Sequence, residues 1–332
     1  MTAEPAAARP ELGAAGAGPP ALRLRWGATI SGAVVVTLVR PATWAFGLLA
    51  FLAGGGLVLA AWPIVVLPTP TGLQNSLGNP ISSLVFGAPS ATLLALLVGG
   101  LLAALAVVAA GLLMGAWAER QLIAIAVEAA ADEGILAPAA DLEGAPGIVR
   151  IAVLRVLGLA PVAGALLLAW RPVYDVTYRE LILPGNLATP LPLRVLGDVP
   201  WVLIGIGVAW LLGDAAAAVG VRRLVIERRP VLVAWLLGWG DLLRRPHRVV
   251  PTALVGVSVL LLLAVPALLA AAVGWTRVRD VVLEGRDVTT ILVALVTWVG
   301  TWLGALVLAG IGQAFRSATW TLELPRRPGA GS

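Results

Sequence analysis

Long apolar stretches separated by short polar segments set the pattern of this chain. No charged residue occurs between Arg40 and Glu119, and the segment LPTPTGLQNSLGNP, rich in Pro, Gly and Asn, divides that interval. A turn at this point predicts two spans, at residues 42–66 and 90–117. Further apolar stretches follow at residues 151–170, 199–220, 249–274 and 289–314. Each can cross a hydrocarbon core of about 30 Å as a helix, so we predict about six transmembrane helices.

The spans are predicted to form an all-α bundle, because backbone groups in lipid need partners within their own segment and alternating strand patterns are absent. Apolar segments that stop at Arg-Pro precede the first and the fifth span, TLVRPATW and DLLRRPHR. Two outer loops share the patterns YRELILPG (178–185) and VRDVVLEG (278–285), and spans one, three and five each end with a tryptophan, at Trp62, Trp170 and Trp275. We therefore predict three hairpins, each introduced by a cytoplasmic interfacial amphipathic helix. Chance matches in a biased sequence are the alternative.

Composition agrees with a membrane protein. Of the 332 residues, 59% are hydrophobic and 12% are charged, whereas a soluble domain carries about a quarter charged residues. A soluble fold cannot bury this much apolar surface. The chain also has no cysteine, which excludes disulfides, thiolate metal sites and thiol nucleophiles.

All 23 basic residues are arginine, which is typical of a high-GC bacterial genome. With the N-terminus inside, 17 lie in cytoplasmic segments and six outside, at Arg171, Arg179, Arg194, Arg277, Arg279 and Arg286. This asymmetry favours a bacterial inner-membrane protein with both termini in the cytoplasm. We expect a disordered cytoplasmic tail at residues 1–22, a six-span membrane domain at 23–318 and a cytoplasmic C-terminal tail at 319–332.

Reporter fusions test this topology. Fusions at Gly134, at Asp241 and at the C-terminus should report the cytoplasm, whereas fusions at Asn75, Gly185 and Gly285 should report the outside. The measurement pairs a phosphatase that is active only outside with a fluorescent protein that is active only inside. An inverted signal at any of these positions would show that the arginine asymmetry does not set the orientation.

Residues 227–248 (ERRPVLVAWLLGWGDLLRRPHR) predict an amphipathic helix that is too short to span and lies at the inner interface. One face carries the large apolar residues Leu232, Trp235, Leu236, Trp239, Leu242 and Leu243. The opposite face, expected to be hydrated, carries Ala234, Gly238, Asp241 and Arg245. Anchoring is the simplest role. The neighbouring cations and tryptophans define a candidate patch for anionic lipids or a protein partner, formed by Arg222, Arg223, Arg228, Arg229, Trp235, Trp239, Arg244, Arg245 and Arg248.

Two charged residues fall inside predicted spans, Arg155 near the inner end of span three and Asp214 near the inner end of span four. At about 1.5 Å per residue, Arg155 lies about 6 Å into the bilayer and Asp214 lies about as deep. An unpaired acid is costly there, by up to about 3 kcal/mol at mid-span. We therefore expect an intramembrane ion pair between Arg155 and Asp214 that locks the two spans together. An ion path through Asp214 is the alternative.

The sequence shows no catalytic machinery. His247, the single histidine, lies among arginines, and no His/Asp/Glu cluster supplies further metal ligands. Ser-His and Cys-His arrangements and phosphate-binding glycine motifs are absent. We expect no catalytic residue, metal or cofactor site, and no enzyme activity. The arginines also lack the interleaved aromatic residues of a nucleic-acid surface, so we expect no nucleic-acid partner.

Residues 128–134 (EAAADEG) follow span two in a long cytoplasmic loop. They match the start of the EAA-x-x-x-G motif with which importer permeases of the ATP-binding-cassette type dock their ATPase, but the downstream I-x-L-P part is missing. A charged helical extension capped at Gly134 explains these residues more simply. The match nevertheless makes an ATPase subunit the alternative partner.

The segment 221–254 resembles the polytopic membrane proteins related to the membrane domain of glycerophosphodiester phosphodiesterases. The resemblance rests on VRRLVIE, RPVLVAWLLGWGDLLRRP and HRVVPTALVGVSVL, where a span ends, an amphipathic Trp/Leu helix follows and an Arg-Pro step opens the next span. The ending AFRSATWTLEL resembles that family's last span and its strand-like tail. It implies a membrane fold without hydrolysis, since no catalytic domain is attached.

Together these observations predict a non-enzymatic multi-pass membrane protein, a scaffold that interacts with membrane lipids and other membrane proteins. The alternative is a transporter or permease subunit of an ATP-binding-cassette or secondary system. A dry centre packed with Leu, Ala and Gly would favour the scaffold. A polar, water-filled cavity would favour transport.

Overall fold

The computed structural model describes residues 26–61, 87, 91–132, 147–183, 189 and 191–323, and within these ranges it is helical without a strand. The helices are α1 (Trp26–Val39), α2 (Ala42–Phe51), the π-helix η1 (Leu52–Gly56), α3 (Leu57–Ala61), α5 (Ala91–Asp132), α6 (Ile148–Gly158), α7 (Ala160–Ile182), α8 (Leu191–Asp198), α9 (Pro200–Ile226), α10 (Val231–Arg244), α11 (Pro246–Leu283) and α12 (Val288–Glu323). The predicted N-terminal tail and Trp62 lie outside the described residues.

Six helical segments among the described residues are long and apolar enough to cross a membrane. They are Ala42–Ala61, Ala91–Asp132, Ile148–Ile182, Pro200–Ile226, Pro246–Leu283 and Val288–Glu323. The chain is therefore an all-α multi-pass membrane protein, which confirms the expectation from its apolar stretches.

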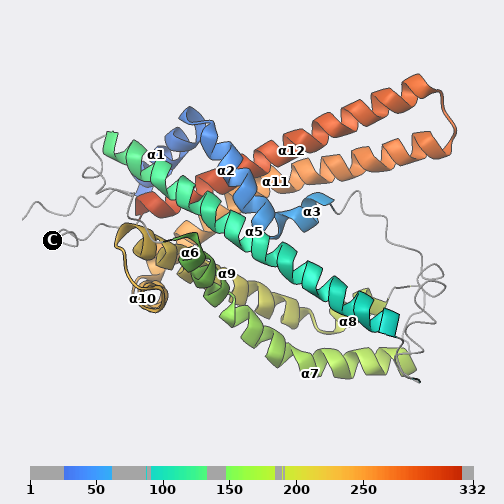
Figure 1. The fold of residues 1–332 in the computed structure, drawn as a ribbon, viewed down its shortest axis with the longest axis horizontal. Helices are drawn as coiled ribbons and strands as arrows, with labels where there is room; N and C mark the ends of the chain where they lie inside the picture. Colours follow the sequence, from blue (N-terminus) through green and yellow to red (C-terminus); the bar gives the residue numbers. More distant parts are fainter. Residues whose placement is uncertain are drawn as a thin grey trace, which may run out of the picture.

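The spans are arranged as three hairpins whose contacts close into a ring. The pairs are α2 with α5, α7 with α9 and α11 with α12, and a short helix (α1, α6 or α10) precedes each pair (Figure 1). Helix α6 packs on α5, and α10 packs on α9, so each short helix contacts the second span of the preceding hairpin. Helix α1 packs on α12, the second span of the last hairpin. The three-hairpin prediction therefore describes how the helices are connected.

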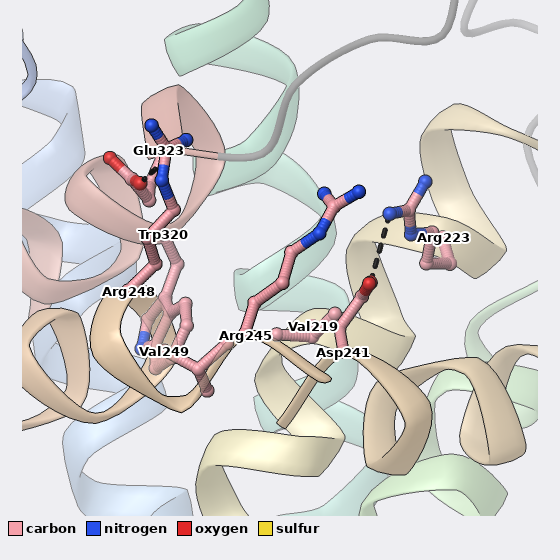
Figure 2. Close-up of a pocket in the computed structure, with 8 residues that line it drawn as sticks. All are labelled: Val219, Arg223, Asp241, Arg245, Arg248, Val249, Trp320 and Glu323. Atoms are coloured by element: carbon pink, nitrogen blue, oxygen red, sulfur yellow. Dashed lines mark hydrogen bonds and ion pairs between the residues drawn. The ribbon is translucent and has the colours of Figure 1, made fainter. Parts of the chain in front are cut away.

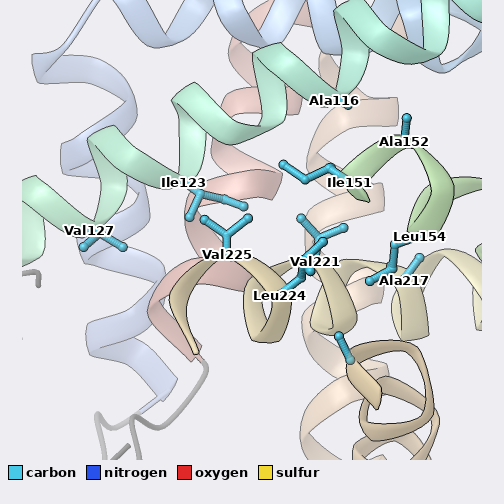
Figure 3. Packing of buried hydrophobic residues seen from close by; sticks show 11 residues of the cluster. Ala116, Ile123, Val127, Ile151, Ala152, Leu154, Ala217, Val221, Leu224 and Val225 are labelled. Carbon is cyan, nitrogen blue, oxygen red and sulfur yellow. The ribbon is translucent and has the colours of Figure 1, made fainter. Parts of the chain in front are cut away.

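The end of the molecule that carries α1, α6 and α10, here called the inner end, is closely packed. Residues 215–225 of α9 and 314–322 of α12 are all buried. One cluster joins α5, α6 and α9 through fully buried side chains that include Ile123, Ile151 and Val221 (Figure 3). Because lipid tails are as apolar as these side chains, the association gains chiefly from close van der Waals contact.

The opposite ends of the hairpins diverge. The α11–α12 hairpin leaves the inner end in a different direction from α5 and from the α7–α9 hairpin (Figure 1). Residues 94–110 of α5 are all exposed, as are Leu168 of α7 (81%) and Leu262 of α11 (73%). Leucine side chains with exposed fractions this high are suited to hydrocarbon and not to water. The diverging halves of the hairpins are therefore suited to contact with lipid.

Two details of the spans differ from the sequence prediction. Span three is broken, because α6 ends at Gly158 and α7 begins at Ala160 with Pro161 in its first turn. Proline lacks the N–H that a continuous helix needs at this position but fits the first turn of a new one.

The shared patterns at 178–185 and 278–285 were predicted as outer loops. Instead, their described residues continue α7 and α11 up to the helix ends.

Residues 319–323 were predicted to begin the C-terminal tail, which the family resemblance makes strand-like, but they continue α12. Thr319 and Thr321 are β-branched and favour strands, but each hydroxyl donates to the carbonyl four residues earlier, at 2.8 and 2.9 Å. Trp320 and Leu322 are buried against the rest of the inner end. Burial at the inner end therefore outweighs the local preference for a strand.

The turn between α11 and α12 is built by two residues with distinct roles. Gly285 has a φ of +65°, a left-handed conformation that glycine adopts without steric cost. Asp287 caps α12, because its carboxylate accepts hydrogen bonds from the Thr290 hydroxyl (2.6 Å) and the Thr290 backbone N–H (3.1 Å). These hydrogen bonds lower the pKa of the Asp287 carboxyl.

Candidate functional site

Five charged side chains from four helices meet close to the inner end. They form the buried charge network, which consists of Glu119 of α5, Arg155 of α6, Asp214 and Arg222 of α9, and Arg316 of α12. Glu119, Arg222 and Arg316 are at most 9% exposed. An unpaired charge that is buried in a membrane protein is costly, so charged residues in such a position are expected to pair with one another and to have a structural or functional role.

All the carboxylate oxygens in the network accept hydrogen bonds from guanidinium groups. For Glu119, Oε2 accepts from Arg155 Nε at 2.7 Å, and Oε1 accepts from Arg222 Nη1 at 3.0 Å. For Asp214, Oδ1 accepts from Arg155 Nη1 at 3.2 Å, and Oδ2 accepts from Arg316. Arg155 therefore bridges the two acids and ties α6 to both α5 and α9.

Small residues let the helices approach closely enough for these contacts. A Cβ atom on Gly213, directly before Asp214, would lie 2.2 Å from the carbonyl oxygen of Gly158. Glycine at both positions therefore brings α6 and α9 together at the level of the network. On the other side, Arg222 Nη2 donates to the carbonyl and the hydroxyl of Ser317 in α12, both at 3.0 Å.

The network holds three cations and two carboxylates, so it carries one surplus positive charge. The Arg155 side chain is 27% exposed, which gives part of that charge access to the surroundings. The Nε atoms of Arg222 and Arg316 are buried without an acceptor among the described residues. The arrangement fixes four helices by multiple charged contacts, and removal of either acid leaves guanidinium charge without compensation.

The structure brings together the two residues that the sequence singled out inside the spans. Arg155 Nη1 lies 3.2 Å from Asp214 Oδ1, as expected from their equal depth. Sequence reasoning missed Glu119, Arg222 and Arg316, which it treated as ordinary charges at the span ends or in the inner patch. The available signal was their setting, since AWAER, VGVRR and QAFRS place each charge among small or apolar residues typical of a packed interface.

The predicted inner patch of arginines and tryptophans is not one accessible surface. Arg222 and Arg223 are 2% and 5% exposed, Arg222 inside the buried charge network and Arg223 paired with Glu227 and Asp241. Both lie on the buried, small-residue part of α9, which explains why they face inward. Trp235 and Trp239 are half-buried against the core. The other patch residues remain at the surface, with Arg248 half-buried and Arg228, Arg229, Arg244 and Arg245 exposed.

Helix α10 follows Arg228–Pro230 and covers residues 231–244 of the predicted segment, but its small-residue face is not hydrated. Ala234 and Gly238 pack on α9, and a Cβ on Gly238 would lie 2.2 Å from the carbonyl oxygen of Ala216. The opposite face exposes Leu232 (64%) and Leu236 (61%), as an interfacial helix requires. The amphipathic prediction therefore placed Leu232 and Leu236 on an exposed apolar face correctly. It was wrong in assigning water to Ala234 and Gly238, where α9 lies, and Leu242 of the predicted apolar face is buried.

The EAA-like segment is a helical extension of α5 as far as Asp132, and Gly134 lies outside the described residues. Ala129 and Ala130 are buried, whereas Glu128 and Asp132 contact Arg40 at 3.2 and 2.9 Å. Ion pairs to the Arg-Pro step before span one occupy these acids. These ion pairs thus link the end of α5 to the residue that precedes α2, within the first hairpin.

Within the described ranges, no group of three or more histidine, aspartate or glutamate side chains is placed to hold a metal ion. His247 is exposed in the first turn of α11. The charged groups of the inner end are instead arranged as arginine–carboxylate contacts.

Fold and site together define an all-α multi-pass membrane protein with an arginine-rich network at one end. Comparison with protein-family models, curated proteins and solved structures finds no match to the chain. The resemblance to the phosphodiesterase membrane domain therefore remains a prediction.

Proposed function

We propose that the chain is a non-enzymatic, multi-pass protein of the bacterial inner membrane with both termini in the cytoplasm. It acts as a scaffold that interacts with membrane lipids and partner membrane proteins at its inner end. The observation that carries this proposal is the saturation of the buried charge network, in which guanidinium groups occupy all the oxygens of Glu119 and Asp214.

Saturation argues against an ion path for a physical reason. A carboxylate that relays protons or cations has to exchange its partners, but arginine stays charged at every accessible pH and holds its geometry through several donors. Three guanidinium groups also repel an approaching cation at this short range. The network is therefore suited to holding α5, α6, α9 and α12 in one arrangement.

Transport is the alternative, and two observations favour it. The outer halves of the hairpins diverge, and the Arg155 side chain at the network is 27% exposed. A molecule that alternates between open and closed arrangements of its hairpins would need both features. The two functions differ in what a neutral replacement of Asp214 does.

A proteoliposome assay separates the two functions. Wild type and Asp214→Asn are reconstituted with an internal pH-sensitive dye, and a potassium diffusion potential is imposed. Scaffold function predicts that both variants show the proton flux of protein-free liposomes, while Asp214→Asn lowers the thermal unfolding midpoint because Arg155 and Arg316 lose an acid. Flux above the protein-free level that disappears in Asp214→Asn would contradict the proposal and establish transport.

A further inference from the structure

A pocket opens at the inner end between α9, α10, α11 and α12. Its charged lining consists of Arg223, Asp241, Arg245, Arg248 and Glu323, and Trp320 forms part of its wall (Figure 2). The pocket is separate from the buried charge network, with which it shares no residue.

The two acids of the pocket are already engaged. Asp241 contacts Arg223 at 2.9 Å, and Glu323 contacts Arg248 at 3.6 Å. Figure 2 shows the Arg245 guanidinium between these two ion pairs. No ion pair or side-chain hydrogen bond holds it within the part of the chain that the structure describes. Arg223 is shared between Asp241 and Glu227, so Arg245 is the guanidinium of the pocket lining that no described acid holds.

A further donor of a lining residue is also unsatisfied. Arg223 Nε is buried without an acceptor among the described residues. The Arg248 side chain is 35% exposed, so the face turned away from Glu323 is open to a ligand. A buried donor without an acceptor is costly, and an anion that enters the pocket would supply acceptor oxygens.

The surroundings of the pocket indicate where the anion comes from. Helix α10, which supplies Asp241 and leads into Arg245, exposes Leu236 (61%) and Leu243 (75%) on the face opposite Asp241. An exposed apolar face of this kind suits α10 to the membrane interface, so the pocket on its other side lies at the level of the lipid headgroups. The cytoplasmic leaflet is rich in anionic lipids, and basic segments near it are attracted to them.

We propose that this pocket binds the phosphate group of an anionic phospholipid, with Arg245 and Arg248 as its direct ligands. Arginine suits this role because its planar guanidinium donates two parallel hydrogen bonds to phosphate oxygens. The inference deepens the proposed lipid-binding function and rests on its assignment of the inner end to the cytoplasmic leaflet.

The test uses the full-length chain in a neutral detergent. Thermal unfolding is followed by tryptophan fluorescence during titration with a short-chain phosphatidylglycerol, with phosphatidylcholine of the same chain length, and with inorganic phosphate. We expect phosphatidylglycerol to raise the unfolding midpoint and the other two to have little effect at equal concentration. Arg245→Gln should weaken the apparent affinity for phosphatidylglycerol about tenfold, as loss of a charged hydrogen bond predicts. Arg248→Gln should weaken it to a similar extent.

Arg150→Gln is the control. Arg150 is an exposed arginine of α6 that neither lines the pocket nor belongs to the arginine patch predicted from the sequence, so its replacement should leave the affinity unchanged. Equal losses in Arg150→Gln and Arg245→Gln would overturn the pocket in favour of diffuse attraction to charge. Protection by inorganic phosphate equal to that by phosphatidylglycerol would overturn the lipid source, and no shift with phosphatidylglycerol would overturn the site. Proton flux in proteoliposomes is a separate measurement, so failure of the scaffold function would be recognised independently.

Discussion

Replacing Glu119 by alanine should lower the free energy of unfolding by about 3–5 kcal/mol, because a buried ion pair that loses one partner leaves an uncompensated charge. Glu119 contacts both Arg155 and Arg222, and the Arg222 side chain is only 1% exposed. Arg222 has no described acid as a second partner and cannot reach water without unpacking α9 from α12. Unfolding in mixed micelles, titrated with a denaturing detergent and followed by tryptophan fluorescence, gives the measurement.

Glu128→Ala provides the control on the same helix. Its carboxylate pairs with Arg40 and its side chain is 65% exposed, and surface pairs of this kind contribute at most about 1 kcal/mol. Equal losses in the two variants would contradict a special role of the network. The double variant Glu119→Leu with Arg222→Met should recover stability relative to Glu119→Ala, because removal of both charges is less costly than removal of one.

Gly238→Ala should destabilise the protein by about 1–3 kcal/mol, the cost of forcing an extra group into a close-packed interface. The added Cβ would lie 2.2 Å from the Ala216 carbonyl oxygen and 3.2 Å from the Gly220 backbone nitrogen. Both obstacles are backbone atoms, so α10 has to move away from α9 as a unit. The same detergent titration detects this loss.

Gly240→Ala, two residues further along α10, should instead raise the free energy of unfolding. A Cβ on Gly240 meets nothing within 4 Å, and alanine is a better helix former than glycine by up to about 1 kcal/mol. If the two substitutions change the free energy of unfolding in the same direction, α10 does not pack on α9 through Gly238.

The spans, the hairpins and the position of α10 could be predicted because they depend on local features of the sequence. Apolar length decides whether a helix crosses the membrane, and Arg-Pro steps mark where a helix begins. The contact between Arg155 and Asp214 was also within reach, since consecutive spans run antiparallel and residues of equal depth on neighbouring spans can meet.

The remaining partners of the network could not be predicted, because they depend on how helices cross. Glu119 and Arg316 come from the first and the last hairpin, and their contacts depend on how α5 packs on α6 and how α12 packs on α9. The environment of Gly238 was missed for a related reason. Small side chains resemble a hydrated face in an amphipathic pattern, but in a membrane protein they are equally typical of a tight helix contact.

The packing of α1 on α12 can form only when nearly the whole chain has been synthesised. Thr29 of α1 donates to Glu323 at the end of α12 at 3.3 Å, across 294 positions of the chain. A ribosome that adds about 5–20 residues per second needs about 15–60 s between these two residues. Until then the face of α1 that carries Ala33 has only its contacts with the alanines of α5 and lacks those with Phe315, Ala318 and Leu322 of α12. The ring of hairpins can therefore close only after the last span has been made.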